Sequence, residues 1–417
     1  MPKITDAVTH ENLVCPFCSL HCDDIKLDLK DNKLYLRNEV PKSCKDKFEK
    51  FNQKSYQNQS SKIKGKICSN DEASNYAKRL LSQSKETIIY NSSSDVNITR
   101  ELLHSASKIN AIIDHANSPI FLKNVGIFQR RGYMATSLTE IKNKSDVVIL
   151  FSNKILNTYP RLLEKFLVPK NSFSINSKNK KIYIIGDKKS NVADCKLKDK
   201  RITFIDFNNK NIPLLLDSLM KRENISELNN TVFSKLSNDI IKSKYLSVLW
   251  ATSEYSAYKE CDQIIHKISD YVVAINEETR AGCLCLAGND GDVSAIQTLG
   301  WMTGFPSRIK FTGNYFEYDK DTNNARHLIS LNSCDLVLHI NVISEKKLIL
   351  NKKQKNIVIG RLSTKFNIDP DVFIPCGVPG IDYPGHVFRT DNVVSLPLTA
   401  VKIPNLKSTQ EILREII

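Results

Sequence analysis

Short apolar runs alternate with amphipathic segments along most of the chain. Apolar residues at helical spacing occupy residues 73–81 and 97–109, and compact apolar runs of strand length recur between and after them. The expected strands are residues 86–90, 146–151, 181–186, 202–206, 245–251, 271–276, 335–341, 356–360 and 371–375. Because strands that alternate with helices pair in parallel, the pattern predicts an α/β fold.

The amino-terminal part of the chain follows another pattern. Residues 25–40 alternate apolar and polar side chains on both sides of Asp31-Asn32, which predicts an antiparallel hairpin. We therefore expect a small cysteine-rich domain at residues 1–70, a first doubly wound α/β lobe at 71–240 and a second lobe at 241–417. The polar stretch at residues 208–238 would be a crossing between the lobes or a surface helix.

Composition narrows the class of protein. The chain has 417 residues, of which 41% are hydrophobic and 25% charged, as in ordinary globular proteins of two or three domains. It has no apolar run of the roughly 18–20 residues that a membrane helix needs, and no signal peptide at its start. We expect a cytoplasmic protein without a membrane partner.

The net charge of +15 raises the question of an acidic partner. The lysines are scattered, without a basic tail and without interleaved aromatic residues, so we expect no nucleic-acid partner. Compositional drift toward lysine explains such a distribution. Attraction of an acidic ligand or of a neighbouring subunit remains the alternative.

Five of the eleven cysteines lie in the first sixth of the chain: Cys15, Cys18, Cys22, Cys44 and Cys68. The first three form C-x2-C-x3-C, and Cys44 can close the coordination from beyond the hairpin. This spacing predicts a metal site, and four-cysteine ligation of a 4Fe-4S cluster fits it better than a zinc ribbon, which usually has two C-x2-C pairs. The remaining alternative is that the thiols pack as small apolar groups. His21, between the cysteines, is expected to support the site rather than to bind metal.

Motifs of other chemistries are missing from the sequence. It contains no G-x-S-x-G, no P-loop, no G-x-G-x-x-G and no H-E-x-x-H, and its eight histidines are scattered singly. Asn289 and Asp290 precede a helix expected to begin near Val293, where a helix amino terminus could receive an anionic group. The simpler interpretation is that Asp292 caps this helix. Four arginines could pair with phosphates or carboxylates: Arg161, Arg280, Arg308 and Arg389.

Several blocks resemble a known family. CPFCSLHCDDIKLDLKDNKLYLRN followed by SCKDKF, at residues 15–48, resembles the start of the B subunit of formylmethanofuran dehydrogenase, a member of the molybdopterin oxidoreductase superfamily. Residues 130–166, 286–306 and 373–392 are similar to its later blocks. The resemblance implies a truncated molybdopterin-oxidoreductase fold, a 4Fe-4S cluster held by the first domain, and molybdenum or tungsten on a molybdopterin cofactor between the two lobes.

One departure from the family changes the expected function. The resemblance implies a cysteine or selenocysteine ligand to the metal within IIDHANSPIF, but Asn117 and Ser118 stand there, beside His115, and the chain has no cysteine between Cys68 and Cys195. Neither an amide nor a neutral hydroxyl replaces a soft thiolate well. This favours loss of the pterin, although serine binds molybdenum in some relatives of the superfamily. We count Asn117, Ser118, Asn289 and Asp290 as candidate cofactor residues, and Ser118 and His115 as candidate catalytic residues.

In this substitution the chain resembles the B subunit of the bacterial formyltransferase/hydrolase complex of methylotrophs. The resemblance implies that hydrolase-like, formyltransferase and C-type partner subunits move a formyl group from formyl-tetrahydromethanopterin to a methanofuran-type carrier and hydrolyse it to formate. This chain would then be a structural subunit in one-carbon metabolism. The enzyme alternative is an active molybdenum- or tungsten-dependent formylmethanofuran dehydrogenase subunit. The binding-module alternative keeps a metal at the cysteines only to stabilise the first domain.

Overall fold

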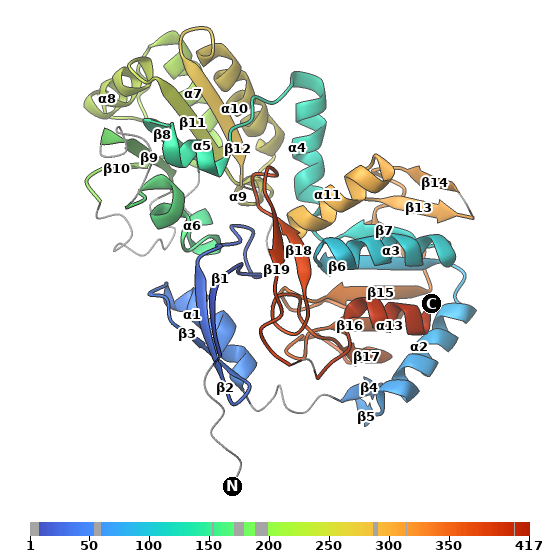
Figure 1. Cartoon of the computed structure of the whole chain (residues 1–417). Helices are drawn as coiled ribbons and strands as arrows, with labels where there is room; N and C mark the ends of the chain where they lie inside the picture. Colours follow the sequence, from blue (N-terminus) through green and yellow to red (C-terminus); the bar gives the residue numbers. More distant parts are fainter. Residues whose placement is uncertain are drawn as a thin grey trace. The chain divides into compact units, whose positions relative to one another are not determined.

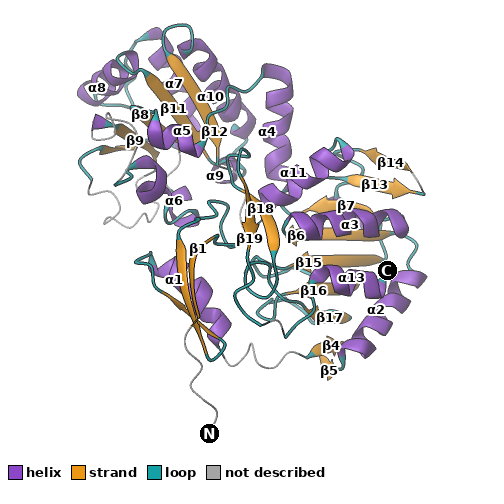
Figure 2. Cartoon of the chain, viewed as in Figure 1, coloured by secondary structure: helices purple, strands orange, loops and turns teal. Residues whose placement is uncertain are grey.

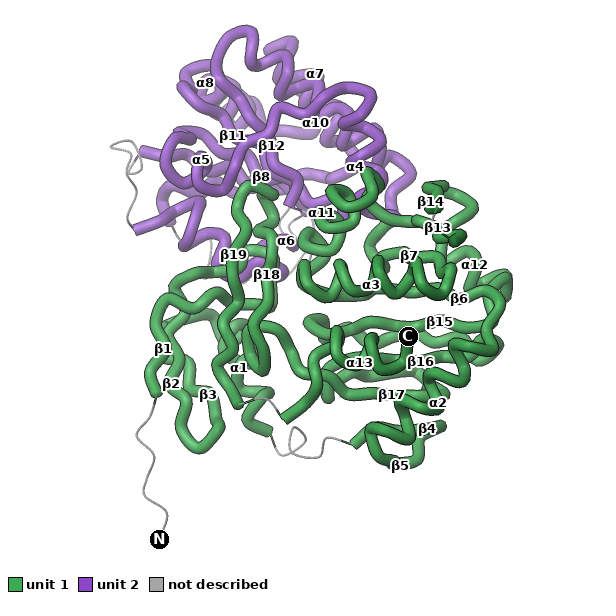
Figure 3. Tube along the Cα trace, turned by 45° about the vertical axis from the view of Figure 1, so that its right-hand side comes forward, with its two compact units in different colours: residues 1–118, 288–417 green, residues 119–287 purple. Residues whose placement is uncertain are grey.

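The structure is a computed structural model that describes residues 8–53, 60–151, 154–170, 179–187, 199–286, 291–313, 315–403 and 405–417. These residues form two compact units, coloured separately in Figure 3. Unit 1 combines residues 1–118 with 288–417, and unit 2 is residues 119–287. The fold is α/β, as predicted, with helices and strands alternating along most of the chain (Figure 2). The boundaries between the units lie after residues 118 and 287, and not at the expected residues 70 and 240.

Unit 1 is built around a mixed sheet. Among the described residues this sheet has nine strands in the order β14-β13-β7-β6-β15-β16-β17-β4-β5 (Figure 1). Their bounds are β4 Ser61–Ile63, β5 Lys66–Cys68, β6 Thr87–Ser93, β7 Ile112–His115, β13 Ile309–Thr312, β14 Tyr315–Tyr318, β15 Leu336–Asn341, β16 Lys355–Gly360 and β17 Val372–Pro375. The central strands β7, β6, β15, β16 and β17 are parallel, and the outer strands are antiparallel. Sheet pairing therefore joins the two segments of unit 1.

Helices and a hairpin complete this part of unit 1. Their bounds are α2 Asn70–Gln83, α3 Val96–Lys108, α11 Asp292–Thr303, α12 Ala325–Leu331, α13 Thr409–Ile416, and the hairpin strands β18 Gly385–Phe388 and β19 Ser395–Leu398. Two helices start with a complete capping box, in which Ser69 pairs with Glu72 before α2 and Ser408 with Glu411 before α13. These reciprocal bonds satisfy amides that a helix start leaves unpaired, so the sequence fixes where both helices begin.

The amino-terminal segment of unit 1 forms a small sheet of its own. Strands β1 (Val8–Leu13), β2 (Ile25–Lys30) and β3 (Lys33–Leu36) pair in that order, and helix α1 (Lys42–Glu49) runs on into a 3-10 turn, Lys50–Asn52. The β2–β3 hairpin is confirmed, because Asp31 and Asn32 adopt the left-handed φ angles of +51° and +56° that a two-residue hairpin turn requires. The ring of Phe17 lies 5.0 Å from that of Phe48 and 5.9 Å from that of Phe51. This apolar cluster holds the cysteine-bearing loop against α1.

Unit 2 is a parallel α/β unit. Its described strands are ordered β10-β9-β8-β11-β12. The strands are β8 Val147–Phe151, β9 Lys181–Gly186, β10 Ile202–Asp206, β11 Tyr245–Trp250 and β12 Arg280–Cys285. The helices are α4 Ser118–Arg131, which begins at the last residue of unit 1, α5 Leu138–Asn143, α6 Ile155–Thr158, the π-helix Leu163–Leu167, the 3-10 turn Asn209–Asn211, α7 Ile212–Lys221, α8 Asn230–Ile241, α9 Thr252–Tyr255 and α10 Cys261–Ile275. The core of the unit lies between sheet and helices, around Val248, Trp250 and Ile268.

Two predictions from the apolar pattern are wrong. Residues 271–276 were expected to be a strand, but residues 271–275 form the last part of helix α10, which ends at Ile275. Buried Ile264, Ile268 and Tyr271 follow one another at helical spacing. The expected second lobe is also split. β11 pairs with β8 in unit 2, whereas β15 pairs with β6 in unit 1, so the strands of residues 241–417 do not share one sheet. The polar stretch 208–238 contains α7 and most of α8.

We expect Gly291 to be irreplaceable at the start of α11. A Cβ on Gly291 would lie 2.2 Å from the carbonyl oxygen of Ser94, and φ is +93°. Gly304, at the other end of the helix, has φ +80° and open space around it. Gly304→Ala should therefore cost only the roughly 1–2 kcal/mol of a left-handed alanine. Gly291→Ala should lower the free energy of unfolding much further in urea titrations. Equal losses for the two variants would contradict the close packing of α11 on β6.

Candidate functional site

The candidate site lies at the carboxyl ends of the parallel strands of unit 1. From β6 the chain passes through α3 to β7 on one side of β6, whereas β15 pairs with the other side. This is a topological switch point, where open α/β sheets usually bind ligands. Asp114 and His115 end β7 there, and Gly291 and Asp292 open α11 beside Ser94, which follows β6.

Asp114 is the centre of a buried polar network. Its Oδ1 accepts hydrogen bonds from the hydroxyls of Ser118 (2.5 Å) and Ser307 (2.7 Å), and these two hydroxyls lie 2.7 Å apart. Its Oδ2 accepts from the backbone amide of Ala325 at 3.0 Å and lies 3.7 Å from Nε of Arg308. Burial raises the pKa of the Asp114 carboxyl, and the two serine hydroxyls oppose that rise. All three side chains are almost fully buried.

His115 and Asn117 lie beside this network. The backbone amide of Asn117 donates to His115 Nδ1 at 3.1 Å, so the imidazole proton is on Nε2, which lies 3.6 Å from Asp292 Oδ1. Burial, reinforced by the positive charges of Lys346 and Arg326, lowers the pKa of His115 to about 3. His115 is therefore neutral at physiological pH. The side-chain amide of Asn117 donates to Asp292 Oδ2.

The carboxyl of Asp292 does not cap α11. The N-cap residue is Gly291, and Asp292 is the first helical residue, with its carboxylate directed to Asn117 and His115. The expectation that Asp292 caps the helix is therefore wrong, because a left-handed glycine takes that position. Asn289 and Asp290 lie outside the described residues.

The residues at the expected metal position do not fit the ligand that the family resemblance implies. Ser118 Oγ donates to Asp114 and accepts from the backbone amide of His115 at 3.2 Å. The Asn117 amide is bound to Asp292. The position offers a hydrogen-bonded hydroxyl and an amide in place of a thiolate, and neither holds a soft, high-valent metal equally well.

Cys15, Cys18 and Cys22 lie in the loop between β1 and β2, and Cys44 lies on α1, beyond the β2–β3 hairpin. The backbone amide of Cys15 donates to the carbonyl oxygen of Cys22 at 2.8 Å, which closes the loop. Burial raises the pKa of the Cys15 thiol to about 12, and Cys18 and Cys44 are near enough to add to this effect. His21, with φ +41°, donates from Nδ1 to the Cys15 carbonyl oxygen at 3.0 Å. The loop is thus folded around its cysteines.

This arrangement fits a cysteine-ligated centre in the type of donor atom, which is sulfur, but not in the placement of the thiols. Nowhere in the part of the chain that the structure describes do three or more His, Cys, Asp or Glu side chains gather so as to hold a metal ion. A zinc ion needs each sulfur ligand about 2.3 Å away, and the thiols are not gathered in that way. A site formed by Cys15, Cys18, Cys22 and Cys44 stays a prediction.

The four candidate arginines have separate partners. In unit 1, Arg308 lies against Asp114 and donates to the Lys320 carbonyl oxygen, and Arg389 forms a buried pair with Asp391 at 2.6 Å. In unit 2, Arg161 binds Glu164, and the Arg280 guanidinium lies 5.2 Å from the ring centre of Tyr245. Of the four, only Arg308 contacts the network at the switch point.

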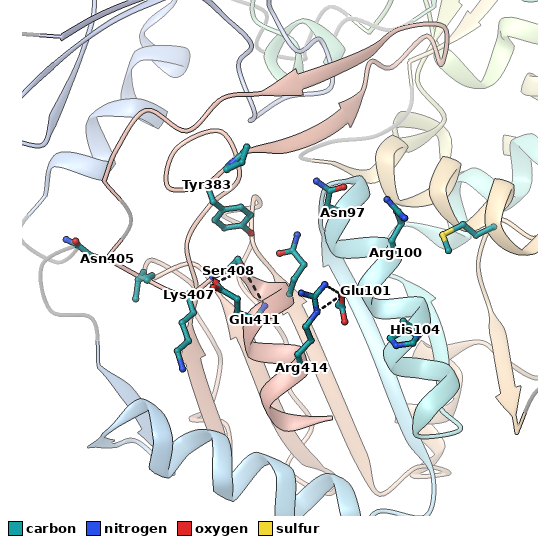
Figure 4. Close-up of a pocket in the computed structure, with 14 residues that line it drawn as sticks. Asn97, Arg100, Glu101, His104, Tyr383, Asn405, Lys407, Ser408, Glu411 and Arg414 are labelled. Carbon is teal, nitrogen blue, oxygen red and sulfur yellow. Dashed lines mark hydrogen bonds and ion pairs between the residues drawn. The ribbon is translucent and has the colours of Figure 1, made fainter.

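A surface groove of about 1030 Å³ lies on another side of unit 1, between α3 and α13 (Figure 4). Its walls are bridged by Arg414, which donates to Glu101 at 2.6 Å, and Glu411 accepts from Ser408 at the start of α13. Because the acidic side chains in the groove already have partners within unit 1, we assign it no function.

Sequence reasoning missed the residues that complete the network. Asp114 ends an apolar strand and Ser307 follows Pro306, and neither position carries a motif. They lie 193 residues apart in the chain, so only the fold brings them together. The polar residue at the end of a buried strand was the available signal.

Known proteins resemble this chain in sequence and in fold. No protein-family model matches the sequence. The chain is 22% identical over 429 aligned residues to the B subunit of the tungsten-containing formylmethanofuran dehydrogenase 2 of Methanococcus maripaludis, covering 98% of both chains. It is 21% identical to the protein of the same name from Methanocaldococcus jannaschii, covering 92% of this chain and 91% of the relative. The chain is a relative of the B subunit of formylmethanofuran dehydrogenase. The resemblance stated from the cysteine motif is thereby confirmed.

A solved structure has a fold similar to that of this chain. The formyltransferase/hydrolase complex FhcABCD from Methylorubrum extorquens, in complex with methylofuran, contains a chain that matches with a TM-score of 0.70 at 19% identity. The match covers 86% of this chain and 97% of that chain. None of the described helices has the length and apolar character needed to span a bilayer. Location in the cytoplasm stays a prediction.

The buried Asp95 should make unit 1 less stable as pH rises toward neutrality. Asp95 caps α3 through Ile98 (2.8 Å) and accepts from the backbone amide of His386 at 3.0 Å. Burial raises the pKa of Asp95 from 3.8 to about 6, so the folded state binds the proton more tightly than the unfolded state. Its ionisation therefore costs stability between about pH 4 and 6, up to about 3 kcal/mol.

The measurement is the pH dependence of urea unfolding in an Asp95→Asn variant. The variant should lack this downward slope between pH 4 and 6, whatever its absolute stability. Asp369→Asn, at an exposed aspartate of the same unit, should keep the wild-type slope. An unchanged slope in Asp95→Asn would show that another group is responsible.

Proposed function

We propose that this chain is the structural, non-redox B subunit of a formyltransferase/hydrolase complex in one-carbon metabolism. The observation that carries the proposal is the state of Ser118, whose hydroxyl donates to Asp114 at 2.5 Å at the position where the resemblance implies a metal ligand. The likeness to a chain of the FhcABCD complex supports it.

The buried network gives this proposal its chemical basis. The Ser118 hydroxyl would have to leave the carboxylate of Asp114 and lose its proton to become a metal ligand. The Asp114 carboxylate would then lose one of its two hydroxyl donors and keep Ser307, which leaves this buried charge less well compensated. The network is thus better suited to holding the switch point together than to holding molybdenum or tungsten.

The remaining steps belong to other subunits in this proposal. Hydrolase-like, formyltransferase and C-type subunits would transfer the formyl group from formyl-tetrahydromethanopterin to a methanofuran-type carrier and release formate. The described part of this chain has no group of His, Cys, Asp or Glu side chains placed for metal-assisted hydrolysis. That division of labour agrees with the absence of hydrolase motifs from the sequence.

A second candidate is an active molybdenum- or tungsten-dependent formylmethanofuran dehydrogenase subunit. The names of both curated relatives favour it, because each is a tungsten-containing dehydrogenase subunit. It requires Ser118 to bind the metal. The two candidates therefore differ in one measurable property, which is the metal content that depends on Ser118.

A pair of serine variants distinguishes the two candidates. Ser118→Ala and Ser307→Ala each remove a hydroxyl that donates to Asp114, so both should lower stability by about 1–3 kcal/mol. We expect substoichiometric molybdenum and tungsten in the purified wild-type complex, and the same formate-producing turnover with either variant. Stoichiometric metal and viologen reduction, lost in Ser118→Ala and retained in Ser307→Ala, would establish the dehydrogenase.

We further propose that Cys15, Cys18, Cys22 and Cys44 hold a 4Fe-4S cluster with a structural role. Protein prepared without oxygen should then contain iron and sulfide, and Cys18→Ser should lose both and unfold at lower temperature. Cys68→Ser is the matched control, because Cys68 ends β5 of the other sheet in unit 1. Equal iron content in wild type and Cys18→Ser would refute the cluster. Zinc in place of iron would identify a different centre.

A further inference from the structure

One edge of the nine-stranded sheet of unit 1 is open. Its outer strand, β14, pairs with β13 on one side and with no described strand on the other (Figure 1). Other strands pair readily with such an edge, so proteins commonly protect it with lysine, proline or a bulge. The opposite outer strand, β5, has three residues and begins with Lys66. Strand β14 lacks these protections, because it reads YFEY, has an unbroken register with β13, and exposes 81% of Tyr315 and 41% of Phe316.

The backbone of β14 presents unpaired groups at this edge. The amide of Asp319, directly after β14, donates to the carbonyl oxygen of Arg308, directly before β13, at 3.4 Å. In an antiparallel pair every second residue bonds to the neighbouring strand, and the residues between them point the other way. The N–H and C=O groups of Phe316 and Tyr318 therefore face the open edge, where the described residues offer them no partner.

The side chains of β14 give the two faces of the edge different characters. Phe316 lies opposite Phe311 of β13, with ring centres 5.6 Å apart, and Tyr318 stacks on Phe305 at 4.9 Å. We call these four rings the aromatic ladder. Glu317 points to the other face, is exposed, and is the one charged residue of the strand. A strand added at this edge can extend the aromatic ladder, and Glu317 restricts what can lie opposite it.

A second copy of β14 meets these conditions in one antiparallel register. A two-fold axis at Phe316 pairs this residue with Phe316 of the second copy and places Glu317 opposite Tyr315. An axis at Glu317 would place two glutamates opposite each other, and an axis at Tyr318 would place Glu317 opposite Asp319. Like charges directly opposite each other destabilise a strand pair. Among the registers that set Phe316 or Tyr318 opposite an outward-facing residue of the second β14, only the axis at Phe316 avoids this repulsion.

We propose that unit 1 associates with a second copy of this chain by antiparallel pairing of the two β14 strands about Phe316. The sheets of the two copies then continue as one sheet, and the two aromatic ladders meet at the axis. The pairing adds two backbone hydrogen bonds between the two Phe316 residues. Because the contact is short, we expect a dimer that dissociates readily, as is usual for interfaces below about 1,200 Å². The proposal goes beyond the proposed function and does not depend on it.

Sedimentation velocity of the full-length chain over a range of concentrations tests the association. We expect a monomer–dimer equilibrium in the wild type. Phe316→Lys places two positive charges opposite each other and should raise the dissociation constant at least about tenfold. The control is Tyr35→Lys, the same kind of change at an exposed aromatic residue of β3, an outer strand of the amino-terminal sheet. It should leave the equilibrium unchanged. A wild type that stays monomeric, or equal effects of the two variants, would overturn the proposal.

Cysteine cross-linking tests the register without a change of charge. Residues paired on the axis have Cα atoms about 5.5 Å apart, which suits a disulfide. Phe316→Cys should therefore give a covalent dimer under mild oxidation, above the background that the native cysteines give in the wild type. Tyr315→Cys should stay at this background, because Tyr315 lies opposite Glu317 of the second copy. Stronger cross-linking of Glu317→Cys than of Phe316→Cys would place the axis elsewhere and contradict the proposed pairing.

Discussion

The buried carboxylate of Asp114 is the constraint on which the switch point of unit 1 depends. It ends β7, and its oxygens accept from Ser118 at the start of α4, from Ser307 before β13 and from the amide of Ala325 at the start of α12. Segments far apart in the sequence are thus tied to one side chain. A carboxylate removed from water is stable only with such partners, so the geometry of this region follows from the need to satisfy one charge.

In the proposed role, that constraint explains how this region can keep its structure without a metal ligand. In the proposed role, the space around residues 115–118 is filled by hydrogen bonds among His115, Asn117 and Asp292 and by the serines on Asp114. A polar network whose members satisfy one another makes a site rigid and specific. Under the proposed function, the fold that this chain shares with the dehydrogenase relatives would be kept for its shape, and other chains would carry the chemistry.

Much of the fold could be predicted from local patterns, and the site could not. The β2–β3 hairpin follows from alternation around Asp31-Asn32, and most of the parallel strands follow from their apolar runs. Tyr271 was misassigned because an apolar, β-branched run looks the same in a strand and at the end of a buried helix. The pairing of β15 with β6 and the contact of Ser307 with Asp114 depend on chain topology, which no local pattern encodes.

The division of unit 1 between two separate segments has a consequence for synthesis of the protein. Residues 119–287 are continuous and carry their own core, so unit 2 can fold as soon as it leaves the ribosome. Strand β15, the partner of β6, is synthesised about 250 residues later. Until then, the edge of β6 that pairs with β15 stays unpaired. The nascent chain is therefore exposed to aggregation at this edge of β6 during that interval.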